Sequence, residues 1–219
     1  MNFTTKISVL LLASSALAIA APFTNGSFES PGTSTAFALP NGSTSVSGWT
    51  YTGSNNNVFY TASNTFGILA GAGNLYITFG GNGTGGGVMS QTFDTISGTT
   101  YNVNYLVTTQ QGNVNSPFQT NSVQAFDGVN LLAGVANSLG MANGTWVNGT
   151  QLTFVATSSS TTLRFTDTNL PGTFINVNWG LDNVSVNAVA DNGNAVPEPA
   201  TYALVLASLG AIAFHRRKR

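Results

Sequence analysis

Charged residues are scarce in this sequence. Only 6% of its 219 residues are Asp, Glu, Lys or Arg, whereas soluble domains contain roughly a quarter. Between Ala21 and Val196 the only basic residue is Arg164, against six acidic residues. A protein that binds nucleic acid needs Lys and Arg side chains to displace counterions from the phosphates. The composition therefore excludes nucleic acid as a partner, and it leaves neutral Asn, Ser, Thr and Gly to cover the surface.

Cysteine is absent, and the only histidine, His215, is the fifth residue from the C-terminus. The chain before it therefore has no disulfide, no nucleophile activated by histidine and no metal site made of Cys or His ligands. A glycoside hydrolase needs two carboxylates that face each other across a cleft, and no pair of acids here has a spacing that argues for one. We therefore expect a protein that is not an enzyme, with a glycoside hydrolase as a minor alternative.

Residues 1–20 have the three parts of an export signal. Lys6 supplies the positive charge, residues 7–16 (ISVLLLASSA) form the apolar stretch, and Ala18 and Ala20 are the small residues before a cleavage site. We expect signal peptidase to cleave between Ala20 and Ala21. The alternative is an N-terminal membrane anchor, but the apolar run is too short to span a bilayer comfortably.

The last 24 residues combine a proline-rich motif, an apolar run at 200–214 and a basic end. Fifteen helical residues rise about 22 Å, which is less than the roughly 30 Å of a hydrocarbon core. Such a helix would hold the chain in the inner membrane only transiently, with the basic residues on the cytoplasmic side. The residues that define the two ends of this segment are Val196, Pro197, Glu198, Pro199, Arg216, Arg217, Lys218 and Arg219.

This arrangement resembles the PEP-CTERM sorting signal of Gram-negative bacteria. The resemblance implies an exosortase that recognises residues 196–199 and removes the helix. It also implies an exported protein that ends at the cell surface or in the extracellular matrix, where exopolysaccharide of the biofilm is a possible partner. The alternative is an ordinary single-span anchor, for which the apolar run is short.

Between residues 21 and 190 no helical period is found. Short runs rich in Val, Phe, Tyr and Thr are separated by Gly, Asn and Ser, which is typical of strands. Asp127-Gly128 predicts a hairpin turn, and Asn148-Gly149 predicts either a hairpin or a β-bulge. We expect an all-β fold, a single jelly-roll β-sandwich at 21–190 followed by a linker at 191–195. The predicted strands are 66–70, 75–79, 88–93, 101–108, 123–126, 131–135, 145–155, 161–166 and 181–186.

Three motifs in the body, NGSFESP at 25–31, Gly48-Trp49 and WGLDNVSV at 179–186, carry a second resemblance. They resemble the opening and closing segments of galactose-binding-like jelly rolls, which include many carbohydrate-binding modules. The resemblance implies that the two segments are neighbours and that Glu29 and Asp182 share a structural Ca²⁺. Carboxylate and carbonyl oxygens are the ligands that Ca²⁺ prefers. The alternative for Glu29 is an ion pair with Arg164 or a role in capping a loop.

Aromatic side chains offer a second kind of candidate site, because flat rings can stack on the apolar faces of sugars. The candidates are Tyr51, Tyr60, Tyr76, Phe118 and Trp146, whereas Trp49 and Trp179 are expected in the core.

We therefore expect an exported surface or matrix protein with a non-catalytic carbohydrate-binding module. The first alternative is a purely structural coat protein with no defined ligand. Ice binding is a minor alternative, since the chain has no repeat that would build a regular threonine array.

Overall fold

The computed structural model describes residues 22–80, 85–110, 118–140, 144–169 and 178–190. The predicted signal peptide, the linker at 191–195 and the sorting tail at 196–219 lie outside these residues. The chain divides after Asn187 into two units, and the description below concerns the first. Within the described residues, no helix has the length and apolar character needed to cross a membrane.

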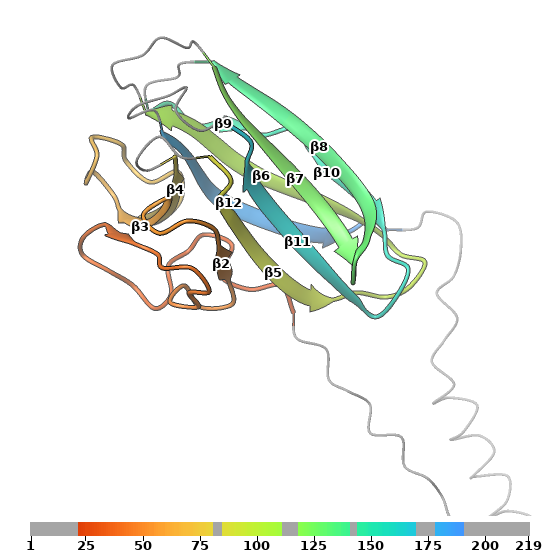
Figure 1. Ribbon diagram of the computed structural model, residues 1–219. Coiled ribbons are helices and arrows are strands. Elements are labelled where there is room, and N and C mark those ends of the chain that lie inside the picture. Colours follow the sequence, from red (N-terminus) through yellow and green to blue (C-terminus); the bar gives the residue numbers. More distant parts are fainter. Residues whose placement is uncertain (1–21, 81–84, 111–117, 141–143, 170–177, 191–219) are drawn as a thin grey trace, which may run out of the picture. The chain divides into compact units, whose positions relative to one another are not determined.

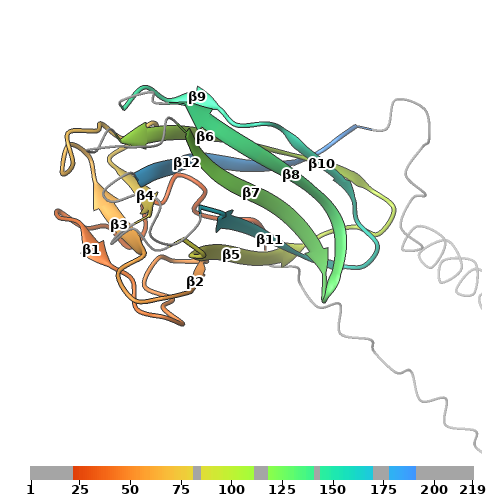
Figure 2. The same cartoon turned by 45° about the horizontal axis from the view of Figure 1, so that its top comes forward.

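The regular structure of the described residues consists of β-strands (Figure 1). They form two sheets, and Figure 2 shows the sheets as two layers. Sheet A has the order β1-β3-β4-β12-β6-β10, with β9 also paired to β6, and sheet B has the order β2-β5-β11-β7-β8. The strands are β1 (Phe37–Ala38), β2 (Thr50–Thr52), β3 (Val58–Ala62), β4 (Leu75–Phe79), β5 (Val88–Asp94), β6 (Thr100–Gln110), β7 (Phe118–Asp127), β8 (Asn130–Gly140), β9 (Val147–Asn148), β10 (Leu152–Val155), β11 (Ser160–Asp167) and β12 (Asn178–Ala188).

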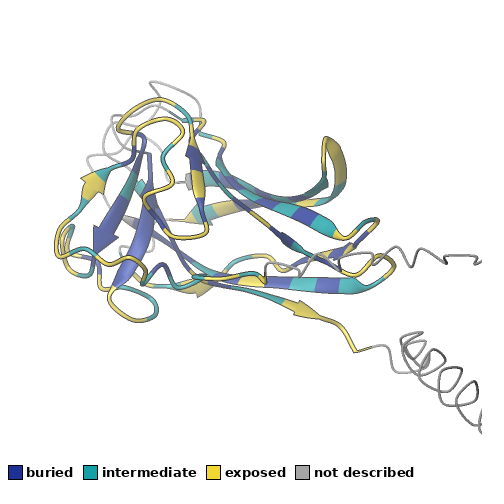
Figure 3. Ribbon diagram, turned by 90° about the horizontal axis from the view of Figure 1, so that it is seen from below, coloured by how far each residue is buried: buried dark blue, intermediate teal, exposed yellow. Residues whose placement is uncertain are grey.

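The predicted all-β sandwich is confirmed, because two sheets pack their apolar faces against each other. Side chains in β6 and β11 alternate between the core and the surface, as the sequence pattern predicted. Tyr101, Val103 and Tyr105 of β6 point inward and are buried. Figure 3 shows the same alternation along the strands of both sheets. The jelly-roll topology of the sandwich stays a prediction.

Trp49 and Trp179 lie in the core, as predicted, with 1% and 0% of their surface exposed. The Trp179 ring stacks on Phe79 with 4.0 Å between the ring centroids. Trp179 belongs to β12, the last strand, and Phe79 belongs to β4, its neighbour in sheet A. The stacked rings therefore join the end of the domain to a strand from much earlier in the chain.

One predicted strand, at residues 66–70, is wrong. This segment forms a turn, because the Asn64 N–H donates to the Ile68 carbonyl and the Gly67 N–H donates to the Asn64 carbonyl. The apolar residues there mimicked a strand pattern. Three short strands near the N-terminus, β1, β2 and β3, were not predicted. Strands β1 and β2 have only two and three residues, too few to show an alternating pattern.

The two turn predictions have clear outcomes. The hairpin at Asp127-Gly128 is confirmed, because Asp127 pairs with Asn130 where β7 turns into β8. At Asn148-Gly149 the bulge is the correct alternative. Strands β9 and β10 both pair with β6, and three residues between Asn148 and Leu152 oppose two between Val103 and Leu106. Only glycine fits at 149, because an added Cβ would overlap the Tyr105 ring.

Replacing Trp179 by Ala should lower the free energy of unfolding by about 3–5 kcal/mol, the usual cost of removing a large buried aromatic side chain. Val129 is 92% exposed, so V129A should change it by no more than about 0.5 kcal/mol. Urea denaturation of the purified protein measures both values. Similar values for the two variants would contradict the assigned core.

Candidate functional site

The segment that carries Glu29 packs against the closing strand β12. The Val184 N–H donates to the Gly26 carbonyl at 2.8 Å. A Cβ on Gly26 would overlap the Val184 carbonyl, so only glycine permits this approach. The opening and closing segments are therefore neighbours, as the sequence resemblance implied, although the opening segment is an irregular stretch and not a strand.

Glu29 and Asp182 both bind the backbone of one loop, residues 71–75. The N–H groups of Asn74 and Leu75 donate to Glu29 Oε1, each at 2.8 Å. On the same loop, the Ala72 N–H donates to Asp182 Oδ2 at 2.8 Å. Of the alternatives left open for Glu29, the structure shows loop capping.

Asp182 is a buried acid with no exposed surface. Burial raises the pKa of Asp182 to about 7, the N–H groups of Ala72, Asn183 and Gly71 oppose this shift, and the charge of Glu29 adds to it. Both carboxylates accept bonds from the same loop, and a cation bound between them would offset their negative charge.

The donor set fits Ca²⁺ in kind, because both side chains offer carboxylate oxygens. Among the described residues, no group of three or more His, Cys, Asp or Glu side chains could hold a metal ion. Backbone carbonyls and water would therefore have to supply most of the six to eight oxygen ligands that Ca²⁺ takes.

The predicted aromatic platform is wrong for its three tyrosines. Tyr51, Tyr60 and Tyr76 each have 0% of their surface exposed, so no ring face is open to a sugar. The Tyr60 hydroxyl donates to the Phe28 carbonyl at 2.7 Å. Trp146 is half-buried and makes a T-shaped contact with the Tyr76 ring. The side chain of Phe118 lies outside the described residues.

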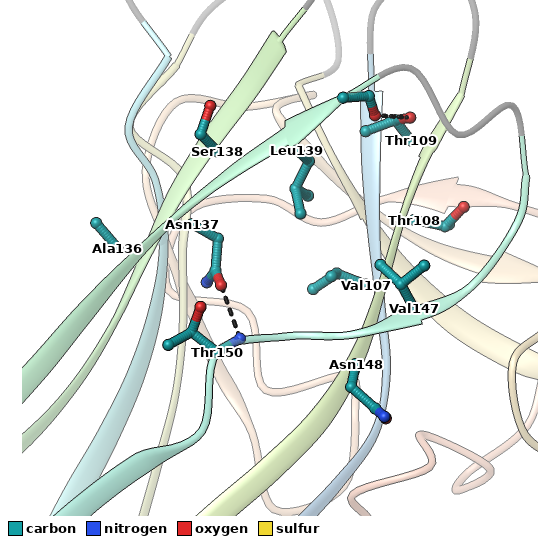
Figure 4. A pocket seen from close by; sticks show the side chains of 11 residues that line it. Val107, Thr108, Thr109, Ala136, Asn137, Ser138, Leu139, Val147, Asn148 and Thr150 are labelled. Carbon is teal, nitrogen blue, oxygen red and sulfur yellow. Dashed lines mark hydrogen bonds between the residues drawn. The ribbon is translucent and has the colours of Figure 1, made fainter.

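Two hollows on the surface are better candidates, and the first lies between the edges of the two sheets. Figure 4 shows this inter-sheet groove, with side chains from β6, β8 and β9 around it. Asn137 is held in its wall, where its Oδ1 accepts the Thr150 N–H at 2.9 Å. The groove has a volume of about 490 Å³ and is lined by Val107, Thr108, Thr109, Ala136, Asn137, Ser138, Leu139, Gly140, Val147, Asn148 and Thr150.

The second hollow lies on the outward face of sheet B. It has a volume of about 380 Å³ and is lined by Thr52, Val88, Ser90, Gln124, Thr162, Arg164 and Thr166. We call it the outer hollow. Strand register places Ser90, Arg164 and Gln124 side by side across β5, β11 and β7. The hollow is thus a polar surface of hydroxyl and amide groups with one cation near its middle.

Arg164 is fixed within the outer hollow by an aromatic contact. Its guanidinium carbon lies 4.2 Å from the centroid of the Phe126 ring. No acid among the described residues forms an ion pair with it, so its five N–H donors are available to a ligand. The sequence contained a signal for this site, since Arg164 is the only basic residue between Ala21 and Val196.

Residues 195–219 match the PEP-CTERM protein-sorting motif. That motif marks an exported protein that is processed by an exosortase, as residues 196–199 and the basic end predicted. Among curated proteins, none matches the chain.

Solved structures of several β-sandwich proteins are similar to the body. A cyclase from Fischerella sp. TAU in complex with 4-(1H-indol-3-yl)butan-2-one is 20% identical, with a TM-score of 0.58 over 78% of this chain and 98% of that chain. The Stig cyclase Fisc from the same organism is 18% identical, with a TM-score of 0.57 over 78% of this chain and 97% of that chain. TmCBM61 in complex with β-1,4-galactotriose is 13% identical, with a TM-score of 0.52 over 77% of this chain and 99% of that chain. At these identities the likeness shows the fold alone, and the fold hosts more than one function.

The burial of Asp182 predicts how the stability of the metal-free protein depends on pH. The folded state keeps the Asp182 proton up to a pKa of about 7, whereas the unfolded state releases it near 3.8. Between these values the folded state binds more protons, so the free energy of unfolding should fall as pH rises from about 4 to about 7. In D182N the fall should be shallower.

Urea denaturation in EDTA at several pH values measures this dependence. Burial also raises the pKa of Asp167, to about 6, so the difference between wild type and D182N is clearest between pH 6 and 7. D127N is the control, since hydroxyls of Thr157 and Ser158 lower the pKa of Asp127 and place its titration below this window. Equal slopes for wild type and D182N would contradict the prediction.

Proposed function

We propose that this protein is sorted to the cell surface or the extracellular matrix, where its sandwich binds an acidic polysaccharide at the outer hollow without catalysis. The observation that carries the proposal is Arg164, an unpaired cation held over Phe126 within a surface of hydroxyl and amide groups. Sorting rests on the PEP-CTERM motif at 195–219.

Arg164 suits recognition of a carboxylate, such as that of a uronic acid in a polysaccharide. A guanidinium group presents parallel N–H donors that match the two oxygens of a carboxylate. Contact with the Phe126 ring orients the group before binding, so little side-chain freedom is lost when a ligand arrives. Asp167 and Asp182, which would repel such a ligand, are buried.

The register of sheet B places polar groups at regular spacing around Arg164. One row across the sheet contains Thr50, Ser90, Arg164 and Gln124, one residue from each of four adjacent strands. Adjacent strands lie about 4.8 Å apart. A sugar chain laid across the strands would therefore meet a hydroxyl, guanidinium or amide group at each step.

The chemistry of the outer hollow supports binding without turnover. No carboxylate is among the residues that line it. Cleavage of a glycosidic bond normally uses a pair of carboxylates, one of which protonates the leaving oxygen. A polysaccharide bound here would meet no such groups.

The likeness to TmCBM61, which was solved with β-1,4-galactotriose, supports a saccharide as the class of ligand. A structural coat protein with no ligand is the second candidate, favoured by the low charge of the chain. The two differ in whether any polysaccharide binds.

We further propose that Ca²⁺ binds between Glu29 and Asp182 and stabilises the loop at 71–75. The attachment of both carboxylates to the same loop is the observation in favour of a cation. When bound, the ion would supply positive charge, and the two side chains would hold it while they keep their bonds to the loop backbone.

Arg164→Ala should weaken binding of a carboxylated polysaccharide such as polygalacturonate by about tenfold to a hundredfold, because a charge-assisted hydrogen bond contributes about 1.5–3 kcal/mol. Arg164→Lys should keep the charge but lose the paired geometry, and it should bind with intermediate affinity. Affinity electrophoresis measures both, with neutral galactan as the control glycan. Equal retention of wild type and R164A would contradict the outer hollow as the site.

Excess Ca²⁺ should raise the unfolding temperature by several degrees, because a ligand at 100 times its dissociation constant stabilises a protein by about 2.7 kcal/mol. Calorimetry with Ca²⁺ and then EDTA measures this shift. E29Q and D182N should abolish it, whereas D127N, at the β7–β8 hairpin, should keep it. An unchanged unfolding temperature in the wild type would remove the calcium site.

A further inference from the structure

Exposed apolar side chains gather at one end of the sandwich. Among the described residues the two most exposed large apolar side chains are Val129, at 92%, and Ile96, at 69%. Val129 is in the β7–β8 turn, and Ile96 follows the end of β5. Leu131, near the start of β8, and Val155, at the end of β10, are 55% and 51% exposed. We call these four residues the apolar end. Single exposed apolar residues are common on proteins, but a group of them indicates a surface that contacts something.

Hydrogen bonds join the loops that carry the apolar end. The Gly98 N–H, in the loop after β5, donates to the Ala156 carbonyl, in the loop after β10, at 2.8 Å. In that second loop the Ser158 hydroxyl donates to Asp127 Oδ1, at the end of β7, at 2.9 Å. The two loops and the β7–β8 turn are therefore held together as one surface.

The closing strand β12 also ends at this end of the sandwich. Near its beginning, an added Cβ on Gly180 would lie 2.9 Å from Thr108 Cγ2, close to the end of β6. Strand β12 therefore runs back along β6 toward Thr100, which follows the loop that contains Ile96. Figures 1 and 2 both show the end of β12 at the same end of the sandwich as the β7–β8 turn.

Only a short length of chain separates β12 from the sorting signal. Strand β12 ends at Ala188, the PEP-CTERM motif covers residues 195–219, and the apolar run begins at residue 200. Residues 189–199 span at most about 40 Å when fully extended. Strand β6, with 11 residues, is itself about 37 Å long, so the opposite end of the sandwich is farther away by about that length. While the apolar run is held in a membrane, the apolar end is the end that can reach the lipid.

The charges at this end decide which kind of lipid surface it fits. Asp94, at the end of β5, and Asp127 are acidic, whereas the lone cation Arg164 belongs to the outer hollow. Anionic headgroups would be repelled by the two acids, while Ile96 and Val129 gain free energy when they leave water. We infer that the apolar end docks on a lipid surface without net charge while the sorting tail holds the chain at the membrane. The inference rests on that tether, and it does not depend on the outer hollow.

A fluorescent label at a single position tests the inference, because the chain contains no cysteine of its own. Val129→Cys would carry an environment-sensitive dye in the chain with residues 195–219 intact, inserted in phosphatidylcholine vesicles. We expect the dye emission to shift to the blue and to be quenched by a quencher attached to lipid. Leu69→Cys is the matched control, because Leu69 is 67% exposed and its carbonyl accepts the Trp146 Nε1–H, near the far end of β6. Its label should stay in water.

Ile96→Asp, introduced into the chain labelled at position 129, should lower the ratio of embedded to exposed label by about tenfold, because one apolar side chain no longer leaves water. Leu69→Asp, the same change at a residue of equal exposure, should leave the ratio unchanged. I96D should still bind polygalacturonate, and R164A should still dock on the vesicles. The failure of one proposal is therefore distinguishable from the failure of the other.

Equal signals from the labels at positions 129 and 69 would overturn the inference, as would a chain that does not float with the vesicles. A blue shift that appears without vesicles as the protein concentration rises would also overturn it. That result would identify a second copy of the chain, and not lipid, as the partner of the apolar end.

Discussion

Contacts between aromatic rings cross the space between the two sheets, and the remaining structure depends on them. Edge-to-face and tilted contacts connect Phe93 to Phe23, Phe23 to Trp49, Trp49 to Phe165, and Phe165 to Tyr105. These rings come from both sheets and from the opening segment. With no disulfide in the chain, burial of these large side chains is what holds the layers together. The Gly26–Val184 approach and the loop bound by Glu29 and Asp182 are positioned by this packing.

The inward and outward faces of sheet B have different roles. The outward face of sheet B is free to present Arg164 and its neighbouring hydroxyls, because alternate residues of β11, Leu163 and Phe165, supply the core contacts. At one end of the sandwich the inward face is polar instead, so ring packing gives way there to amide and carboxyl groups such as Asn121 and Asp167. The proposed polysaccharide site therefore lies on the outward face, where the core does not constrain which residues are present.

The sequence predicted the strands that have one buried and one exposed face. In β6 and β11 the alternation of apolar and polar residues identified both the strand and its inward positions. Strand β4 was also predicted, at Leu75–Phe79, but all its residues are buried, so alternation could not show that Tyr76 is covered on its own face by Trp146. The sugar platform failed at its three tyrosines for this reason, since an aromatic residue in a strand has the same sequence signal on either face.

The polar residues of the core were beyond sequence reasoning for a related reason. Asn121 and Gln119 interrupt the apolar pattern of β7, and a polar residue at an inward position is indistinguishable from one on a loop until the partner strands are known. Glu29 and Asp182 were identified from the motifs around them, but their common attachment to residues 71–75 depends on a contact between segments more than a hundred residues apart. Arg164 was conspicuous as a lone cation, and only the sheet register showed what surrounds it.

Hydroxyl and amide pairs on the sheet surfaces, such as Thr92 with Thr162, Thr153 with Asn102 and Gln151 with Asn104, take the positions that ion pairs occupy in many proteins. Surface ion pairs weaken as salt is added, and charges more than about 10 Å apart are largely screened at 0.1 M. Hydrogen bonds between neutral groups are largely unaffected. An exported protein meets whatever ionic strength its surroundings have, from fresh water to brine. The surface of this sandwich is therefore suited to keep its cross-strand contacts as the salinity around the cell changes.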